Sequence, residues 1–122
     1  MFRELEVVLV RKLRSITREV DGTAGAMRQP RIGDQGTVVL VLGDAEYAVE
    51  SVKASGLTVW LADFHEDELA AALSGWTFAV EEVSAGVYRA TGIGPGGLRV
   101  EATDTDDSIA LSRCRELAIP NT

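Results

Sequence analysis

Residues Ile32 to Phe64, which read IGDQGTVVLVLGDAEYAVESVKASGLTVWLADF, decide the fold of this chain. Three apolar runs in this stretch are separated by short turns that contain glycine: Val38 to Leu42, Tyr47 to Val52 and Leu57 to Leu61. Short runs of β-forming residues bounded by Gly and Asp are typical of sequential antiparallel strands. One curled sheet of this kind, closed by a strand from elsewhere in the chain, would form a small β-barrel.

The first of these runs is expected to follow simple strand alternation. Alternation predicts that Val38, Leu40 and Leu42 share one face of the strand. Val39 and Val41 would then lie on the opposite face.

The composition is that of a soluble globular protein. The chain has 122 residues, of which 46% are hydrophobic, enough for one ordinary domain or two very small ones. Its start, MFRELEVVLVRKLRS, has acids within the apolar part and is not expected to be a signal peptide. Cys114 is the single cysteine, so an internal disulfide is excluded and a reducing compartment fits. We therefore expect a cytoplasmic protein.

Charge is distributed unevenly along the chain. The formal net charge is −7, but residues 1–31 carry seven basic and four acidic side chains, which leaves −10 for the remainder. Such an acidic body repels nucleic acid and is complementary to a basic partner protein. The simpler alternative is that the negative charge only keeps a small protein soluble.

The N-terminal part is expected to form one strand and a long basic loop. Phe2 to Val10 alternates in part between apolar and polar residues, which predicts the first strand. Residues 11–31 have no clean period and contain Gly22, Gly25 and Pro30, so we expect a loop. Its basic side chains either bind an anion or an acidic partner, or are solvated charges on a mobile excursion. We favour the second interpretation, because loops are mobile by default.

A short helix is predicted after the last strand of the first domain, over residues 65–73. Glu66, Asp67 and Glu68 would occupy its first turn, where the helix dipole favours acids. Gly75 stands where a glycine that ends a helix is expected. The first domain would therefore end near residue 70.

A second domain is predicted from Trp76 onward. Alternation from Trp76, from Val87 to Ile93 and from Leu98 to Thr103 predicts a three-stranded meander. A last helix follows, with Asp104 or Thr105 as its N-cap. Its apolar face is predicted to consist of Ala110, Leu111, Cys114, Leu117 and Ala118.

Three apparent binding or catalytic motifs fail on their context. Gly92 to Gly97 matches GxGxxG, but a strand follows where the dinucleotide fingerprint needs a helix. The acids of residues 104–108 lack the glycine and glutamate of a calcium loop. His65 begins like HExxH, yet Leu69 replaces the second histidine. With one histidine and one cysteine in the chain, we expect no zinc site, no catalytic constellation and no cofactor.

Residues 2–69 resemble a family of small bacterial SH3-like domains of unknown function, similar to KOW-type barrels. The segments that carry the resemblance are LEVVLV at Leu5 to Val10, GDQGTVVLVL at Gly33 to Leu42, YAVESV at Tyr47 to Val52 and DEL at Asp67 to Leu69. The insertion of residues 11–31 departs from the short first loop of that family. Such domains are often encoded beside toxin-like proteins, so the resemblance implies an immunity or antitoxin role. WTFAVEEVSAGVYRATG, from Trp76, is similar to the β-β-β-α halves of HicB-type antitoxins.

The sequence thus predicts an α+β, mainly β protein with two domains. Residues 1–70 would form an SH3-like β-barrel with a long basic first loop at 11–31, and residues 76–122 a β-β-β-α domain with three antiparallel strands and one C-terminal helix. The predicted function is that of a non-enzymatic, acidic immunity or antitoxin protein that binds and neutralises a basic toxin. The alternative is a KOW-like nucleic-acid-binding or translation-associated module.

Two acidic clusters are the predicted contacts with that protein partner. They stand at the starts of the two predicted helices, where the dipole alone also explains acids. Their members are Glu66, Asp67, Glu68, Asp104, Asp106 and Asp107. The identity of the partner and the oligomeric state are left open by the sequence.

Overall fold

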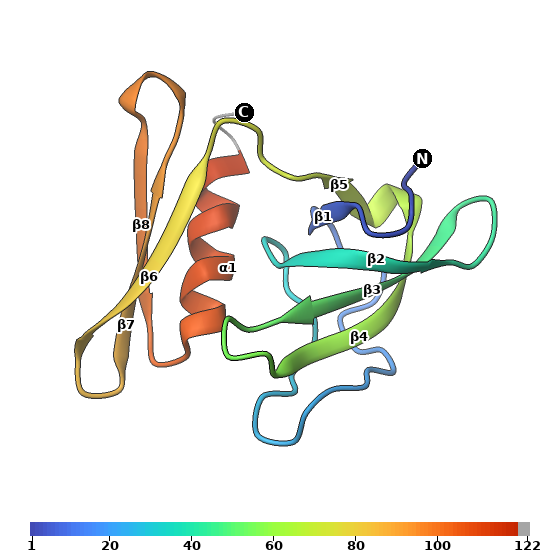
Figure 1. Ribbon diagram of the computed structural model, residues 1–122, viewed down its shortest axis with the longest axis horizontal. Coiled ribbons are helices and arrows are strands. Elements are labelled where there is room, and N and C mark those ends of the chain that lie inside the picture. The colour runs from blue at the N-terminus through green and yellow to red at the C-terminus, as the bar shows by residue number, and fades with distance from the viewer. Residues whose placement is uncertain (120–122) are drawn as a thin grey trace. The chain divides into compact units, whose positions relative to one another are not determined.

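The computed structural model describes residues 1–119, and the chain divides into two compact units, Met1–Ala72 and Leu73–Thr122. The first unit contains a five-stranded antiparallel sheet, and the second contains a three-stranded antiparallel sheet with one helix (Figure 1). The predicted mainly β architecture with one C-terminal helix is confirmed. Within the described residues, no helix has both the length and the apolar character needed to cross a membrane.

The sheet of the first unit is open rather than closed. Its strand order is β4-β3-β2-β1-β5, and every neighbouring pair is antiparallel. β5 pairs with β1, but no ladder joins β4 to β5 within residues 1–119, so the closed barrel expected from the sequence is not observed. The strands are β1 (Val7–Val10), β2 (Gln35–Val41), β3 (Glu46–Val52), β4 (Thr58–His65) and β5 (Leu69–Ala71).

The core of the first unit lies on one face of this sheet. Alternate residues of β3 and β4 oppose one another across the ladder, for example Tyr47 with Phe64 and Val49 with Ala62. Trp60 is fully buried in the same core. The buried cluster comprises Val8, Val10, Val38, Tyr47, Val49, Val59, Trp60, Ala62, Phe64 and Leu69. This arrangement accounts for the apolar runs that dominate residues 32–64.

A β-bulge in β2 changes which side chains face the core. Val38 pairs with Val49 and Leu40 with Ala48, so Val39 is an extra residue in β2. Val38 is fully buried, whereas Leu40 is 49% exposed on the opposite face. The predicted alternation, in which Val38 and Leu40 share a face, is therefore wrong. The bulge turns the apolar end of β2 toward solvent.

The helix predicted over residues 65–73 is also wrong. Glu66–Glu68 forms only one 3₁₀ turn, η1, and Leu69–Ala71 continues as β5. β5 pairs with β1, where Leu69 lies opposite Val10 and is buried in the core. Pairing with β1 and burial of Leu69 outweigh a weak local preference for helix.

The second unit has the predicted β-β-β-α order. β6 (Thr77–Ser84), β7 (Val87–Ile93) and β8 (Arg99–Asp104) form the sheet, with the short turn η2 (Pro95–Gly97) before β8. Helix α1 (Asp107–Ala118) packs on one face of it. The buried cluster here is small and consists of Ala90, Ala102, Ala110 and Cys114, with larger side chains such as Phe78 packed against it.

Close packing at Gly36 gives a stability prediction. A Cβ at residue 36 would lie 2.7 Å from Val49 Cγ1 and 2.8 Å from the carbonyl oxygen of Glu50. Gly36→Ala should therefore lower the free energy of unfolding by about 1–3 kcal/mol, the usual cost of overpacking. Gly43→Ala is the matched control, because nothing lies within 4 Å of a Cβ at that position. Urea denaturation measures both, and equal stability of the two variants would contradict the packing described for β2 and β3.

Candidate protein-binding groove

The long basic segment of residues 11–31 is bound to the first unit by two buried carboxylates. Asp34, only 2% exposed, is the first of them. The Arg28 guanidinium donates two hydrogen bonds of 2.8 Å to its two carboxylate oxygens. The Trp60 indole N–H donates a third bond, also of 2.8 Å, to Oδ2. Asp34 thus ties the segment to the largest side chain of the core.

Glu68 is the second buried carboxylate and is also 2% exposed. Its Oε2 accepts a 2.7 Å hydrogen bond from Arg18 and a 2.8 Å bond from the backbone N–H of Arg14. Its Oε1 accepts the backbone N–H of His65. The Arg18 guanidinium also stacks over the Phe64 ring at 4.6 Å. Arg18 and Arg28 are therefore structural, and the expectation that the basic residues of this segment are all solvated is wrong for them.

Backbone hydrogen bonds hold the same segment along the outer edge of β4. Asp21 and Leu61 exchange two N–H···O bonds, of 3.0 and 2.7 Å. Further along, Thr23 N–H donates to the Thr58 carbonyl and Arg28 N–H to the Val59 carbonyl. β4 is an edge strand of the sheet, so the segment covers backbone groups that would otherwise be open to pairing.

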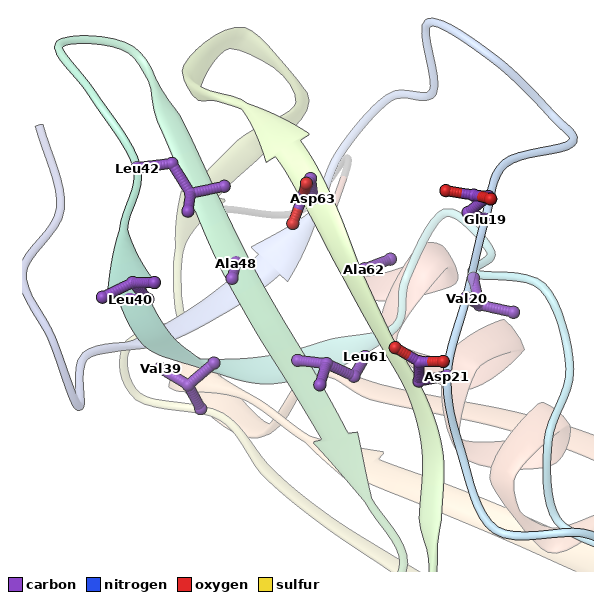
Figure 2. A pocket seen from close by; sticks show the side chains of 10 residues that line it. All are labelled: Glu19, Val20, Asp21, Val39, Leu40, Leu42, Ala48, Leu61, Ala62 and Asp63. Carbon is purple, nitrogen blue, oxygen red and sulfur yellow. The ribbon is translucent and has the colours of Figure 1, made fainter.

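A groove of about 560 Å³ lies between β2 and this segment, on the face of the sheet opposite the core (Figure 2). Leu40, Ala48 and Asp63 form one cross-strand row in it, because Ala48 pairs with both of the others. The methyl group of Ala48 is the smallest side chain in that row and leaves the middle of the face hollow. The groove therefore follows from the strand register and from the size of one residue.

The floor and one side of the groove are apolar. Val39 and Leu40 line it from β2, Leu42 lines it just after the end of β2, and Leu61 lines it from β4. Val39 to Leu42 are four consecutive apolar residues, each between 40% and 49% exposed. A continuous exposed apolar run is unfavourable in water and is expected only where it serves binding.

The opposite side of the groove is acidic. Glu19 and Asp21 line it from the segment, and Asp63 from β4 (Figure 2). None of these carboxylates takes part in a hydrogen bond or ion pair recorded within residues 1–119, and no basic side chain lines the groove. The surface can therefore accept apolar side chains on one side and cationic groups on the other.

The first predicted contact cluster has mainly intramolecular partners. Asp67 accepts three hydrogen bonds from Arg14, at 2.9–3.2 Å, which hold its pKa below the usual range. Glu66 accepts the Tyr47 hydroxyl at 2.7 Å, which together with the N-terminal amine lowers its pKa. Burial raises the pKa of Glu68, but its bonds to Arg18 and to backbone N–H groups outweigh burial, and the net shift is downward.

The second predicted cluster organises the start of α1. Asp106, not Asp104 or Thr105, is the N-cap, and its Oδ1 accepts the backbone N–H groups of Ser108 and Ile109. Asp104 accepts the N–H of Asp106, and Asp107 begins the helix. The N-cap prediction is therefore wrong by one or two residues. A role of these acids in partner binding stays a prediction.

Sequence reasoning missed the carboxylates that the groove brings together, Glu19, Asp21 and Asp63. Two of them lie in a segment with no period, and no local pattern in the sequence marks Asp63 as part of a site. Comparisons with protein families, with curated proteins and with solved structures find no match to the chain.

The Arg18–Glu68 pair gives a pH prediction. The pKa of Glu68 is lower in the folded state than its ordinary value of 4.5. Its contribution to stability is therefore present above that value and is lost as the pH falls through the folded pKa. Glu68→Gln should lower the free energy of unfolding at neutral pH by about 3 kcal/mol, because the charge of Arg18 is left buried without its counter-charge.

The same variant should also lose stability less steeply than wild type on acidification. Urea denaturation between neutral pH and about pH 3 measures both effects. Asp67→Asn is the control and should cost less, because the Asp67 side chain is 36% exposed. Parallel stability curves for Glu68→Gln and wild type would contradict an ionised, buried Glu68.

Proposed function

We propose that this chain is a non-enzymatic, cytoplasmic binding protein of the immunity or antitoxin type, which binds and neutralises a basic partner protein. The observation that carries the proposal is the groove, which has an exposed apolar run on one side and, on the other, three carboxylates for which residues 1–119 supply no recorded side-chain partner. A surface of this composition is complementary to a protein segment with apolar and cationic side chains.

The charge of the whole chain supports the same proposal. The net charge of −7 attracts a basic protein over a range of about 8–10 Å at physiological salt and accelerates its association. The apolar floor of the groove would then supply the short-range part of the binding energy.

The alternative, a KOW-like module that binds nucleic acid, has weaker support. Its binding surface would be the basic segment of residues 11–31. Arg18 and Arg28 of that segment are engaged in buried ion pairs, and Lys12 and Arg14 both pair with Asp67. Few of its cations therefore remain to neutralise phosphates, which is the main source of affinity for nucleic acid.

The strand arrangement supports the SH3-like part of the proposal. β5 follows a single 3₁₀ turn and pairs with the first strand, so the first and last strands of this unit lie side by side in the open sheet. The three-stranded sheet with one helix is in keeping with the HicB-like resemblance of the second unit. Both resemblances are part of the proposal, and the role in toxin neutralisation that they imply is part of it too.

The proposal is tested with the protein encoded next to this chain. That protein should arrest growth when it is expressed alone, and co-expression of this chain should restore growth through a stable complex. In a parallel assay, fluorescence anisotropy at about 0.15 M salt should show no tight binding of single-stranded RNA or duplex DNA. A neighbour that is harmless or does not bind, or submicromolar binding of nucleic acid, would contradict the proposal.

A further inference from the structure

We infer that the groove between β2 and the segment of residues 19–21 is the docking site for a basic amphipathic segment of a partner protein. This inference rests on the proposed function and gives it a surface and a ligand chemistry. The occupant carries leucine-sized apolar side chains next to Lys or Arg. Two properties of the groove favour this occupant. The apolar side chains on one side are exposed to solvent, and the carboxylates on the other side have no recorded ion-pair partner within residues 1–119.

The apolar side of the groove results from the β-bulge in β2. The bulge at Val39 shifts the phase of β2, so that Leu40 lies on the outer face beside Ala48 instead of in the core. Without that extra residue, continued alternation from the buried Val38 would return Leu40 to the core face. Bulges often redirect a side chain at a binding site. β2 thereby presents Leu40 to solvent, next to a hollow that can receive a side chain of a partner.

The acidic side of the groove fixes the charge of the occupant. Glu19, Asp21 and Asp63 come from two separate parts of the chain, and among the described residues no basic side chain lines the groove to neutralise them. A cationic group of an occupant could pair with these exposed carboxylates, which take part in no recorded ion pair within residues 1–119. The acids of η1 and of the start of α1 are different, because they already have intramolecular partners.

Backbone pairing keeps the two sides of the groove at a fixed spacing. Asp21 is hydrogen-bonded through its backbone to Leu61, and Asp63 lies on the same strand two residues further on. Arg18 Nη1 donates a 3.0 Å hydrogen bond to the Asp63 carbonyl, which holds the segment against β4 just before Glu19. The docking surface is thus pre-organised, and an occupant would not have to order it on binding.

The direct test uses peptides of defined chemistry and the whole chain. The probe is a capped, fluorescently labelled peptide of about ten residues in which Leu and Lys alternate. Two comparison peptides replace Leu by Ser or Lys by Glu. We expect saturable binding of the Leu–Lys peptide alone, since both sides of the groove must be engaged. Equal binding of the Ser–Lys peptide, or no binding of the Leu–Lys peptide, would overturn the inference.

Variants of the groove locate the binding site. Asp21→Asn with Asp63→Asn should weaken binding of the Leu–Lys peptide about fivefold and reduce its salt dependence. Glu4→Gln with Glu116→Gln removes the same charge from exposed positions outside the groove and should change the affinity less than about twofold. Equal losses in both double variants would mean diffuse charge attraction and would overturn the inference.

The apolar side has its own matched pair of variants. Leu40→Thr should weaken binding about fivefold through loss of buried apolar area, while Val83→Thr, at a similarly exposed strand position outside the groove, should not. Circular dichroism and urea denaturation establish that all four variants are folded before binding is measured.

The same variants separate this inference from the proposed function. If the neighbouring protein is neutralised equally well by wild type and by the groove variants, the docking site is wrong and the function stands. If wild type does not neutralise that protein, yet the groove binds the Leu–Lys peptide with the predicted losses, the function is wrong and the docking site stands.

Discussion

Two buried arginine–carboxylate pairs, Arg28–Asp34 and Arg18–Glu68, determine how the first unit is assembled. Each joins the long basic segment to a buried carboxylate and to an aromatic residue of the core: Asp34 accepts the Trp60 indole N–H, and Arg18 stacks over the Phe64 ring. A buried ion pair is not a strong source of net stability, because desolvation offsets its attraction. Its effect here is positional, since the two pairs fix the segment to the sheet at two separate points.

That position of the segment has two consequences for function. It withdraws Arg18 and Arg28 from solvent. A segment that is basic in sequence is therefore not a freely exposed basic surface in the fold. It also places Glu19 and Asp21 along β4, where they form the acidic wall of a groove whose opposite wall is apolar. The charge that remains available for binding is therefore negative, which favours a cationic protein partner over nucleic acid.

Much of the fold could be predicted from local pattern, and the groove could not. The turns and alternation after Ile32 predicted β2, β3 and β4, and the same reasoning predicted the meander and helix of the second unit. The bulge at Val39 has no local signal, because Val38 to Leu42 are all apolar and no glycine marks the extra residue. The helix predicted after His65 failed because pairing of β5 with β1 is a contact between distant residues. The partners of Arg18 and Arg28 are likewise set by tertiary structure.

Amide hydrogen exchange of the free protein tests most directly whether the basic segment is an integral part of the first unit. Composition alone predicted an unprotected loop, whereas the structure predicts protection at Asp21, Thr23 and Arg28, whose N–H groups donate to β4 carbonyls. In Glu68→Gln the three amides should lose protection while the amides of β3 keep theirs. Exchange of all three at unprotected rates in the wild-type protein would contradict the assembly described here and, with it, the acidic wall of the groove.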